Sequence, residues 1–365
     1  MTPSPPLTLK RIVPCLAAAI IPWCAADMHA ATNATGTPLR DLADARGIGI
    51  GAAVATRPLA GDSAYRATLA REMNMIVAEN CMKLHQIQPR EGQYDFAGAD
   101  ALAAFAASNN MRLRGHTLVW HQSAPGWLKD RQWSRAELLN VLSQHIATVV
   151  GRYKGRVCCW DVVNEALDDK IPGLRTSLWH DVIGPDYLDH AFTFAHAADP
   201  RAKLFYNDYC TEGLNRKSDE QYAMLKAMLA RGVPVHGVGF QCHFVFDSYP
   251  APETLVSNMN RFADLGLETQ ITELDLRIST PVTPEKLERQ ARAYGEIFRA
   301  ALEARNCTAV LTWGLTDKYS WVPAFFKGFD AGLLFDKDYE PKPAHDAVHQ
   351  ALSIDAVSRG SGPKL

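Results

Sequence analysis

The chain has 365 residues, a formal net charge of −2 and 47% hydrophobic residues. With so little net charge it has no basic field that would hold nucleic acid, so we expect no nucleic-acid partner. Its length is large for one ordinary domain but normal for an α/β barrel with loops.

Residues 1–30 are predicted to be a secretory signal peptide. Lys10 and Arg11 precede a short apolar segment, Ile12 to Ala26, and small residues follow at Ala30 and Ala31. This order is typical of exported proteins. A retained anchor is the alternative, but the segment is short for a membrane span and contains prolines. We expect a secreted protein, extracellular or periplasmic, with no membrane contact after cleavage.

The remaining sequence alternates between strand-like and helix-like segments. Eight short segments rich in Val, Ile, Leu, Phe and Trp are predicted strands, because buried parallel strands have this composition. They are Gly47–Val54, Met75–Asn80, Arg112–Trp120, Val157–Glu165, Lys203–Tyr209, Gly237–Phe244, Glu268–Asp275 and Ala309–Asp317.

Helix signals lie between these segments. Ala99–Ser108 is rich in alanine, and Ser134–Val150 begins with a capping box. Ser218–Arg231 starts with polar residues and ends before a glycine, and Thr283 is followed by a proline at the first helical position. Repeated strand–helix units predict a closed (β/α)₈ TIM barrel.

The predicted barrel is one catalytic domain, residues 31–357, followed by a loose polar tail, residues 358–365. An open doubly wound sheet is the alternative fold. The glycine-rich segment Gly47–Gly51 does not favour it, because its spacing is not that of a dinucleotide-binding turn.

Polar residues gather at the carboxyl ends of the predicted strands. Glu165 and Glu273 close two of them, and the mouth of a barrel brings such ends together. Two carboxyls in one mouth suit cleavage of a glycosidic bond, and a separation of about 5–5.5 Å is expected if the configuration is retained. Asp275 shares a strand face with Glu273, and a histidine between them, His243, would keep Glu273 ionised. Trp120 and the nearby charge on Glu273 would favour a protonated Glu165.

Several motifs of this chain resemble those of the family-10 glycoside hydrolases, chiefly endo-1,4-β-xylanases. The likeness extends from about Leu39 to about Leu352, and the number and order of the motifs make it specific. The motifs are Glu79-Asn80-Cys81-Met82-Lys83, Arg114-Gly115-His116-Thr117-Leu118-Val119-Trp120-His121, Trp160-Asp161-Val162-Val163-Asn164-Glu165, Tyr206-Asn207-Asp208-Tyr209, Gly239-Phe240-Gln241-Cys242-His243, Thr272-Glu273-Leu274-Asp275 and Trp313-Gly314-Leu315-Thr316-Asp317.

The resemblance implies a retaining double displacement, with Glu165 as acid/base, Glu273 as nucleophile and His243, held by Asp275, as its orienting residue. It implies xylan and xylo-oligosaccharides as substrates, and neither a cofactor nor a protein partner. The implied substrate-binding residues are Glu79, Asn80, Lys83, His116, Trp120, Asn164, Tyr209, Gln241, Trp313 and Trp321.

Three positions depart from the family. Ser123 stands where a glutamine usually crowds out the hydroxymethyl group of glucose, and Gln122 precedes it. Leu84 replaces a common aromatic residue, and Cys210 replaces an asparagine on the leaving-group side. A retaining β-1,4-glycanase or aryl-β-glycosidase with a relaxed preference for xylose is therefore the alternative. A barrel that only binds sugar or protein is a third hypothesis, although both carboxylates are present.

Six cysteines follow the signal segment, without the spacing of metal ligands, so no metal site is predicted. Cys158 and Cys159 are adjacent in a predicted strand and are expected to face opposite ways. Export would permit a disulfide between Cys210 and Cys242, but buried free thiols are the favoured interpretation.

Overall fold

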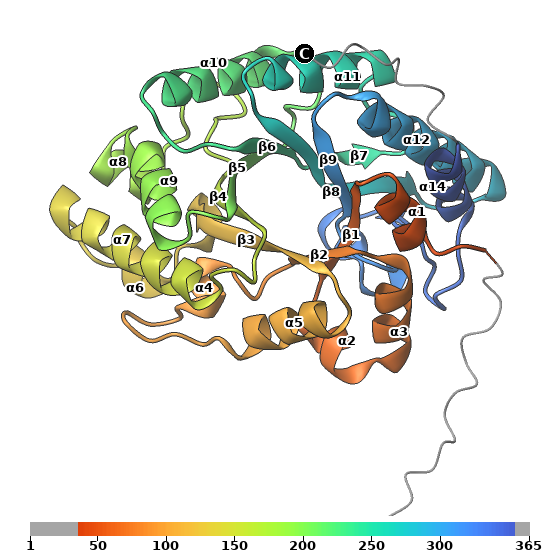
Figure 1. Cartoon of the computed structure of the whole chain (residues 1–365), viewed down its shortest axis with the longest axis horizontal. Coiled ribbons are helices and arrows are strands. Elements are labelled where there is room, and N and C mark those ends of the chain that lie inside the picture. The colour runs from red at the N-terminus through yellow and green to blue at the C-terminus, as the bar shows by residue number, and fades with distance from the viewer. Residues whose placement is uncertain (1–35, 355–365) are drawn as a thin grey trace, which may run out of the picture. The chain divides into compact units, whose positions relative to one another are not determined.

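The computed structural model describes residues 36–354, which form a ring of strands enclosed by helices (Figure 1). The predicted signal peptide, residues 1–30, and the predicted tail, residues 358–365, lie outside the described residues. Within residues 36–354, no helix is both long enough and apolar enough to cross a membrane.

Eight parallel strands of the described region close into a barrel. Each pairs with the next, and the last strand also pairs with the first, so the (β/α)₈ TIM barrel is confirmed and the open sheet is excluded. The barrel strands are β1 (Gly49–Val54), β2 (Met75–Ala78), β3 (Arg112–Trp120), β4 (Cys159–Asn164), β5 (Lys203–Asp208), β6 (Gly237–Phe240), β8 (Glu268–Ser279) and β9 (Cys307–Thr312).

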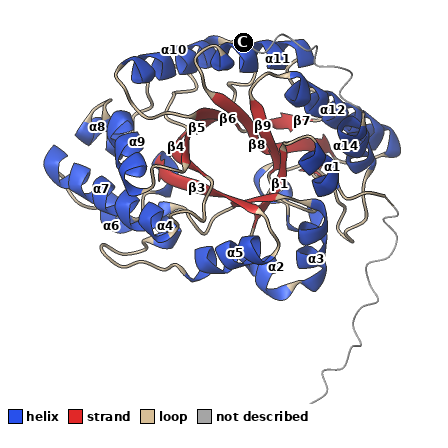
Figure 2. Ribbon diagram, viewed as in Figure 1, coloured by secondary structure: helices blue, strands red, loops and turns tan. Residues whose placement is uncertain are grey.

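A helix follows each barrel strand and packs on the outside of the ring, as Figure 2 shows. These helices are α3 (Ser63–Glu72), α5 (Ala97–Ser108), α7 (Arg135–Arg152), α9 (Tyr187–Ala198), α10 (Arg216–Ala230), α11 (Pro252–Ala263), α12 (Pro284–Glu303) and α14 (Pro343–Ser353). Shorter elements complete the fold: α1 (Leu39–Ala45), α2 (Thr56–Gly61), α4 (Leu84–Ile87), α6 (Gly126–Lys129), α8 (Leu178–Ile183), α13 (Val322–Phe325), β7 (His243–Val245), β10 (Phe329–Asp330) and 3₁₀ turns at His121–Ser123 and Asp317–Tyr319.

Side-chain caps set several helix starts. The predicted capping box is confirmed, since Ser134 and Glu137 each accept a hydrogen bond from the other's backbone N–H. Pro284 is the first residue of α12, as predicted, and Thr283 caps the helix. The predicted start of α10 at Ser218 is two residues too late, because Asn215 caps the helix by accepting a hydrogen bond from the backbone N–H of Ser218 at 3.0 Å.

The predicted sixth strand, Gly237–Phe244, is wrong as a single element. It breaks after Phe240, where Cys242 adopts a left-handed φ of 64°. The chain resumes as β7, which pairs with the outer part of β8 and places His243 directly beside Asp275. The predicted last strand is also too long, because β9 ends at Thr312, and Asp317 begins a 3₁₀ turn.

Apolar side chains fill the centre of the barrel. They come from β1, β2, β4, β5 and β9, and from Trp313 just after β9; the strand residues are Ala53, Met75, Val77, Cys159, Phe205, Ala309 and Leu311. A second, larger apolar layer lies between the strands and the outer helices. Gly115 makes room for a core ring, since a Cβ there would lie 2.1 Å from the Trp160 side chain. Because the centre is packed, a ligand site has to lie at the rim.

The six cysteines of the described residues carry free thiols. Cys242 is buried, whereas Cys210 is exposed, so the prediction of buried free thiols is confirmed for Cys242 and wrong in burial for Cys210. The prediction that Cys158 and Cys159 face opposite ways is wrong, because their sulfur atoms lie 3.7 Å apart. The strand begins only at Cys159, so the alternation of a strand does not extend to Cys158.

Candidate active site

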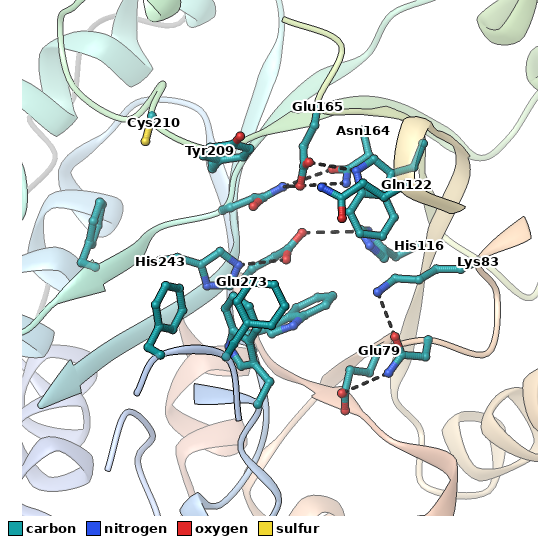
Figure 3. A pocket seen from close by; sticks show the side chains of 18 of the residues that line it. Glu79, Lys83, His116, Gln122, Asn164, Glu165, Tyr209, Cys210, His243 and Glu273 are labelled. Carbon is teal, nitrogen blue, oxygen red and sulfur yellow. Dashed lines mark hydrogen bonds and ion pairs between the residues drawn. The ribbon is translucent and has the colours of Figure 1, made fainter. Parts of the chain in front are cut away.

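A cavity of about 570 Å³ opens at the carboxyl end of the barrel strands (Figure 3). Of the 14 side chains predicted to form a site, 13 line this cavity, and Asp275 lies behind His243. The 13 are Glu79, Asn80, Lys83, His116, Trp120, Asn164, Glu165, Tyr209, Gln241, His243, Glu273, Trp313 and Trp321.

Glu273, on β8, is held in the ionised form by its neighbours. Its Oε1 accepts a 2.7 Å hydrogen bond from Nδ2 of Asn207, and its Oε2 lies 3.2 Å from Nε2 of His243. Burial alone would raise the pKa of Glu273, but the hydrogen bond with His243 and the nearby His116 outweigh it and lower the pKa below its ordinary value. An ionised carboxylate in a buried place is suited to nucleophilic attack.

His243 bridges two carboxylates. Its Nδ1 lies 2.8 Å from Oδ2 of Asp275, and the same oxygen accepts a 2.8 Å hydrogen bond from Nε1 of Trp321. Burial lowers the pKa of His243, but the charges of Asp275 and Glu273 outweigh burial and raise it to about 10. The imidazole is therefore protonated at neutral pH, and both of its nitrogens donate.

Glu165 directly follows β4 and has a left-handed φ of 57°. A non-glycine residue in this region is uncommon, and such conformations cluster at functional sites. Its Oε2 accepts a 2.8 Å hydrogen bond from Nε1 of Trp120. Its Oε1 accepts from Nε2 of Gln241 at 3.0 Å and from Nδ2 of Asn164 at 3.3 Å.

Three amide side chains connect the two glutamates. Nδ2 of Asn207 donates to Glu273 and also to Oδ1 of Asn164 at 2.9 Å. That Oδ1 accepts a second hydrogen bond, of 3.2 Å, from Nε2 of Gln241, which donates to Glu165 as well. Asn207 is not among the predicted site residues; its position at the end of a predicted strand is the sequence signal that points to it.

One end of the cavity presents polar groups beside aromatic rings. Nζ of Lys83 donates to Oδ1 of Asn80 at 2.9 Å, and Nδ2 of Asn80 donates to Oε1 of Glu79 at 3.1 Å. Nζ of Lys83 also lies 5.0 Å from the ring centre of Trp120 and 5.8 Å from that of Trp313. Alternating polar atoms and ring faces are suited to a sugar, which presents hydroxyls at its edge and C–H groups on its faces.

The other end is lined by Cys210, which the resemblance placed on the leaving-group side, and by residues that were not predicted: Glu212, Phe244, Arg277, Phe325 and Phe326. The rings of Phe325 and Phe326 lie 5.0 and 5.2 Å from that of Trp321. Phe325 and Phe326 could have been identified from the sequence, because two successive phenylalanines follow Trp321 in a segment between strand and helix. Tyr209 is fixed at this end because its hydroxyl donates to Asp169 and its ring lies 3.8 Å from Nζ of Lys217.

Ser123 and Gln122, which follow Trp120 in the chain, differ in whether they reach the cavity. Ser123 is fully buried and its Oγ donates to the Trp120 carbonyl, whereas Gln122 faces the cavity.

His116 is oriented by Asp161. Oδ2 of Asp161 lies 3.0 Å from Nδ1 of His116 and accepts a hydrogen bond from Nε of Arg114 at 3.0 Å. Asp161 and Arg114 were not predicted to support the site, because they lie inside otherwise apolar strands.

Across residues 36–354, no group of three or more His, Cys, Asp or Glu side chains is arranged to hold a metal ion. The cavity is lined by carboxylates, amides, aromatic rings, two histidines, Lys83 and Arg277. A protonated carboxyl and an ionised one facing the same bound sugar are the two groups that glycosidic cleavage requires.

Comparison with known proteins agrees with this chemistry. Residues 38–351 match the model of glycosyl hydrolase family 10. The endo-1,4-beta-xylanase B of Thermotoga neapolitana is 42% identical over 318 residues, which cover 86% of this chain and 91% of that protein. The endo-1,4-beta-xylanase A of Fusarium oxysporum f. sp. lycopersici is 40% identical over 289 residues, covering 77% of this chain and 88% of the relative.

Solved structures agree in fold. Native xylanase 10B from Thermotoga maritima matches with a TM-score of 0.84 and 44% identity, covering 86% of this chain and 98% of that chain. Xylanase 10B from Thermotoga petrophila RKU-1, in complex with xylobiose, matches with a TM-score of 0.84 and 43% identity, covering 88% and 98%. The barrel, the paired carboxylates at its mouth and these relatives lead to one assignment: the chain belongs to glycosyl hydrolase family 10.

Proposed function

We propose that this glycoside hydrolase is an endo-1,4-β-xylanase that cleaves internal bonds of xylan and xylo-oligosaccharides with retention of configuration. The observation that carries the proposal is the hydrogen-bonded chain of amides joining Glu165 to Glu273 within one cavity. The names of the relatives, and the xylobiose complex of one of them, support the substrate class.

In the first step, Glu165 donates its proton to the glycosidic oxygen while Glu273 attacks the anomeric carbon. The bond to the leaving sugar breaks, and a covalent glycosyl–enzyme forms. His243, protonated and fixed by Asp275, keeps Glu273 unprotonated until it attacks. Asn164, held by two amide donors, is placed to bind the sugar 2-hydroxyl, a contact that strengthens in the transition state.

In the second step, Glu165 removes a proton from water, and the resulting oxygen nucleophile attacks the same carbon. Glu273 departs as a carboxylate, so two inversions give net retention. The remaining cavity residues would bind the sugar units on either side of the cut. In this proposal the groups binding the non-reducing side are Glu79, Asn80, Lys83, His116, Trp120, Gln241, Trp313 and Trp321, and Tyr209 contacts the leaving side.

The mechanism is tested by the configuration of the first product. Proton NMR of xylo-oligosaccharide hydrolysis should show the β-anomer first, with the α-anomer arising later by mutarotation. Initial release of the α-anomer would rule out the double displacement, because a single displacement inverts the anomeric carbon.

The second candidate is a retaining β-1,4-glycanase or aryl-β-glycosidase that also accepts glucose units. It is favoured by the burial of Ser123, which removes that side chain from the cavity. The position of Gln122 opposes it, since an amide facing the cavity can restore the crowding. Reducing-sugar release from xylan and from carboxymethylcellulose separates the two, and Gln122→Ala should raise the relative activity on the cellulose derivative if Gln122 excludes glucose.

Export is also part of the proposal. Residues 1–30 would be removed as a signal peptide, leaving a catalytic domain over residues 31–357 with a short tail. Amino-terminal sequencing of the enzyme recovered from the medium and from the periplasm tests this directly. An intact Lys10–Ala26 segment in the active, membrane-bound protein would show a retained anchor instead.

A further inference from the structure

Cys158 and Cys159 form a close thiol pair at the end of the barrel opposite the catalytic cavity. Their sulfur atoms are 3.7 Å apart, both thiols are free, and they lie at the start of β4, whereas Glu165 follows its end. Cys159 is buried, while Cys158 is partly exposed. The proposed hydrolysis uses neither residue.

The backbone holds this pair as a dithiol. The Cys158 N–H donates to the Leu113 carbonyl at 2.9 Å, and the Cys158 carbonyl accepts from the Lys203 N–H at 3.0 Å, so neighbouring strands fix the residue on both sides. Adjacent Cα atoms are about 3.8 Å apart across a trans peptide, less than the ~4.4 Å lower limit of ordinary disulfides. A disulfide between these neighbours would therefore be strained.

Positive charge activates the pair. Nη1 of Arg114 lies 3.5 Å from the sulfur of Cys159, within hydrogen-bonding range of sulfur. The hydrogen bond between the two sulfurs, aided by Arg112 and Arg114 and opposed by burial, lowers the pKa of Cys158 to about 7. The pKa of Cys159 is raised by its hydrogen bond with Cys158, by burial and by the unfavourable charge of a second thiolate beside the first. The lowered pKa makes Cys158 the more nucleophilic of the two sulfurs.

We infer that Cys158 and Cys159 together form a bidentate binding site for a trivalent arsenical, a soft, thiophilic centre. Soft thiolate ligands select soft centres. Each sulfur forms one bond to arsenic, the arsenic–oxygen bonds break, and the protons of the pair leave with oxygen as water. No electrons are transferred, so no oxidant or reductant is needed. The sulfurs lie 3.7 Å apart, close enough for one atom to bridge them, and the partly exposed Cys158 provides the entry point.

Phenylarsine oxide is the probe. The reduced full-length protein should bind one arsenic per chain and lose two titratable thiols, with the adduct seen by intact mass spectrometry. Chelation predicts that 2,3-dimercaptopropanol removes the arsenic, whereas 2-mercaptoethanol at the same thiol concentration does not. Removal by the monothiol would overturn the inference, because it would indicate attachment through a single sulfur.

Cys158→Ser should abolish binding, and Cys210→Ser, which removes an exposed single thiol, should leave binding unchanged. The thermal unfolding midpoint of each variant verifies its folding. A second measurement uses the wild-type protein alone: the arsenical should protect Cys158 and Cys159 from N-ethylmaleimide, as read by peptide mapping. Equal binding by Cys158→Ser, or alkylation of both cysteines in the arsenical-treated protein, would overturn the inference.

Discussion

Nδ2 of Asn207 donates a 2.7 Å hydrogen bond to Oε1 of Glu273, the carboxylate proposed to attack the sugar. The amide cannot rotate freely, because its Oδ1 accepts a 2.7 Å hydrogen bond from Oγ1 of Thr272 and its second N–H is used by Asn164. Asn207 therefore holds the proposed nucleophile at a fixed angle in the cavity.

Replacing this amide should slow catalysis. Asn207→Ala removes a hydrogen bond to a charged group, of the kind that contributes ~1.5–3 kcal/mol, so kcat on xylan should fall by about 10- to 100-fold. Asn207→Asp should be worse than Asn207→Ala, because a second carboxylate would then face Glu273. Steady-state kinetics of both variants test this, and an aspartate variant more active than the alanine variant would contradict the proposed contact.

Glu273→Ala should abolish turnover of every substrate, since no group remains to form the covalent intermediate. Added azide should restore activity on aryl xylosides that carry a good leaving group, by occupying the space of the lost carboxylate. The product should then be an α-xylosyl azide, identifiable by NMR, because only one inversion occurs. A β-xylosyl azide would indicate that another residue is the nucleophile.

Glu165→Ala should distinguish between substrates. Xylan has a poor leaving group and needs the proton, so its hydrolysis should fall by about 10²- to 10⁴-fold. The first step on an activated aryl xyloside should be nearly unaffected, and a burst of phenol should appear because the intermediate then hydrolyses slowly. Equal losses of the first step on both substrates would count against the acid role.

The charge on His243 should make stability depend on pH. Its pKa is raised from 6.5 to about 10, so the folded state binds the proton more tightly than the unfolded chain. The resulting stabilisation is fully present below pH 6.5 and is lost as pH rises towards 10, at up to ~1.4 kcal/mol per pH unit. Urea unfolding at several pH values should therefore show the gap between wild type and His243→Gln shrinking over this window. A gap that stays constant from pH 6 to pH 10 would contradict a charged His243.

Patterns that repeat along the chain made much of the fold predictable. Apolar runs mark the barrel strands because both faces of a parallel strand are buried, and Arg112–Trp120 matches β3 at both ends. The capping box at Ser134 encodes its own hydrogen bonds, so the start of α7 could also be read from the sequence.

Features that depend on a single backbone angle were not predictable. The apolar run Gly237–Phe244 gives no sign that Cys242 turns left-handed, yet this turn divides β6 from β7 and carries His243 to Asp275. The facing of Cys158 and Cys159 depends likewise on where β4 begins, which composition does not define to one residue.

The site was more predictable than its surroundings. Polar side chains at strand ends stand out in apolar sequence, and parallel strands bring their ends together. Arg277 was missed because β8 continues beyond the predicted strand end at Asp275, and Phe326 because it directly follows the short helix α13. Sequence alone does not reveal that these residues reach the cavity.

The seam of the barrel links residues far apart in the chain. Oγ1 of Thr312 donates to the carbonyl of Gly51, 261 positions earlier, where β9 meets β1. A nascent polypeptide cannot complete this ring until nearly all of it has been synthesised, and such non-local pairing slows folding. Slow closure would suit the export proposed above, since an unclosed chain would remain threadable through a narrow pore until the final segment has emerged.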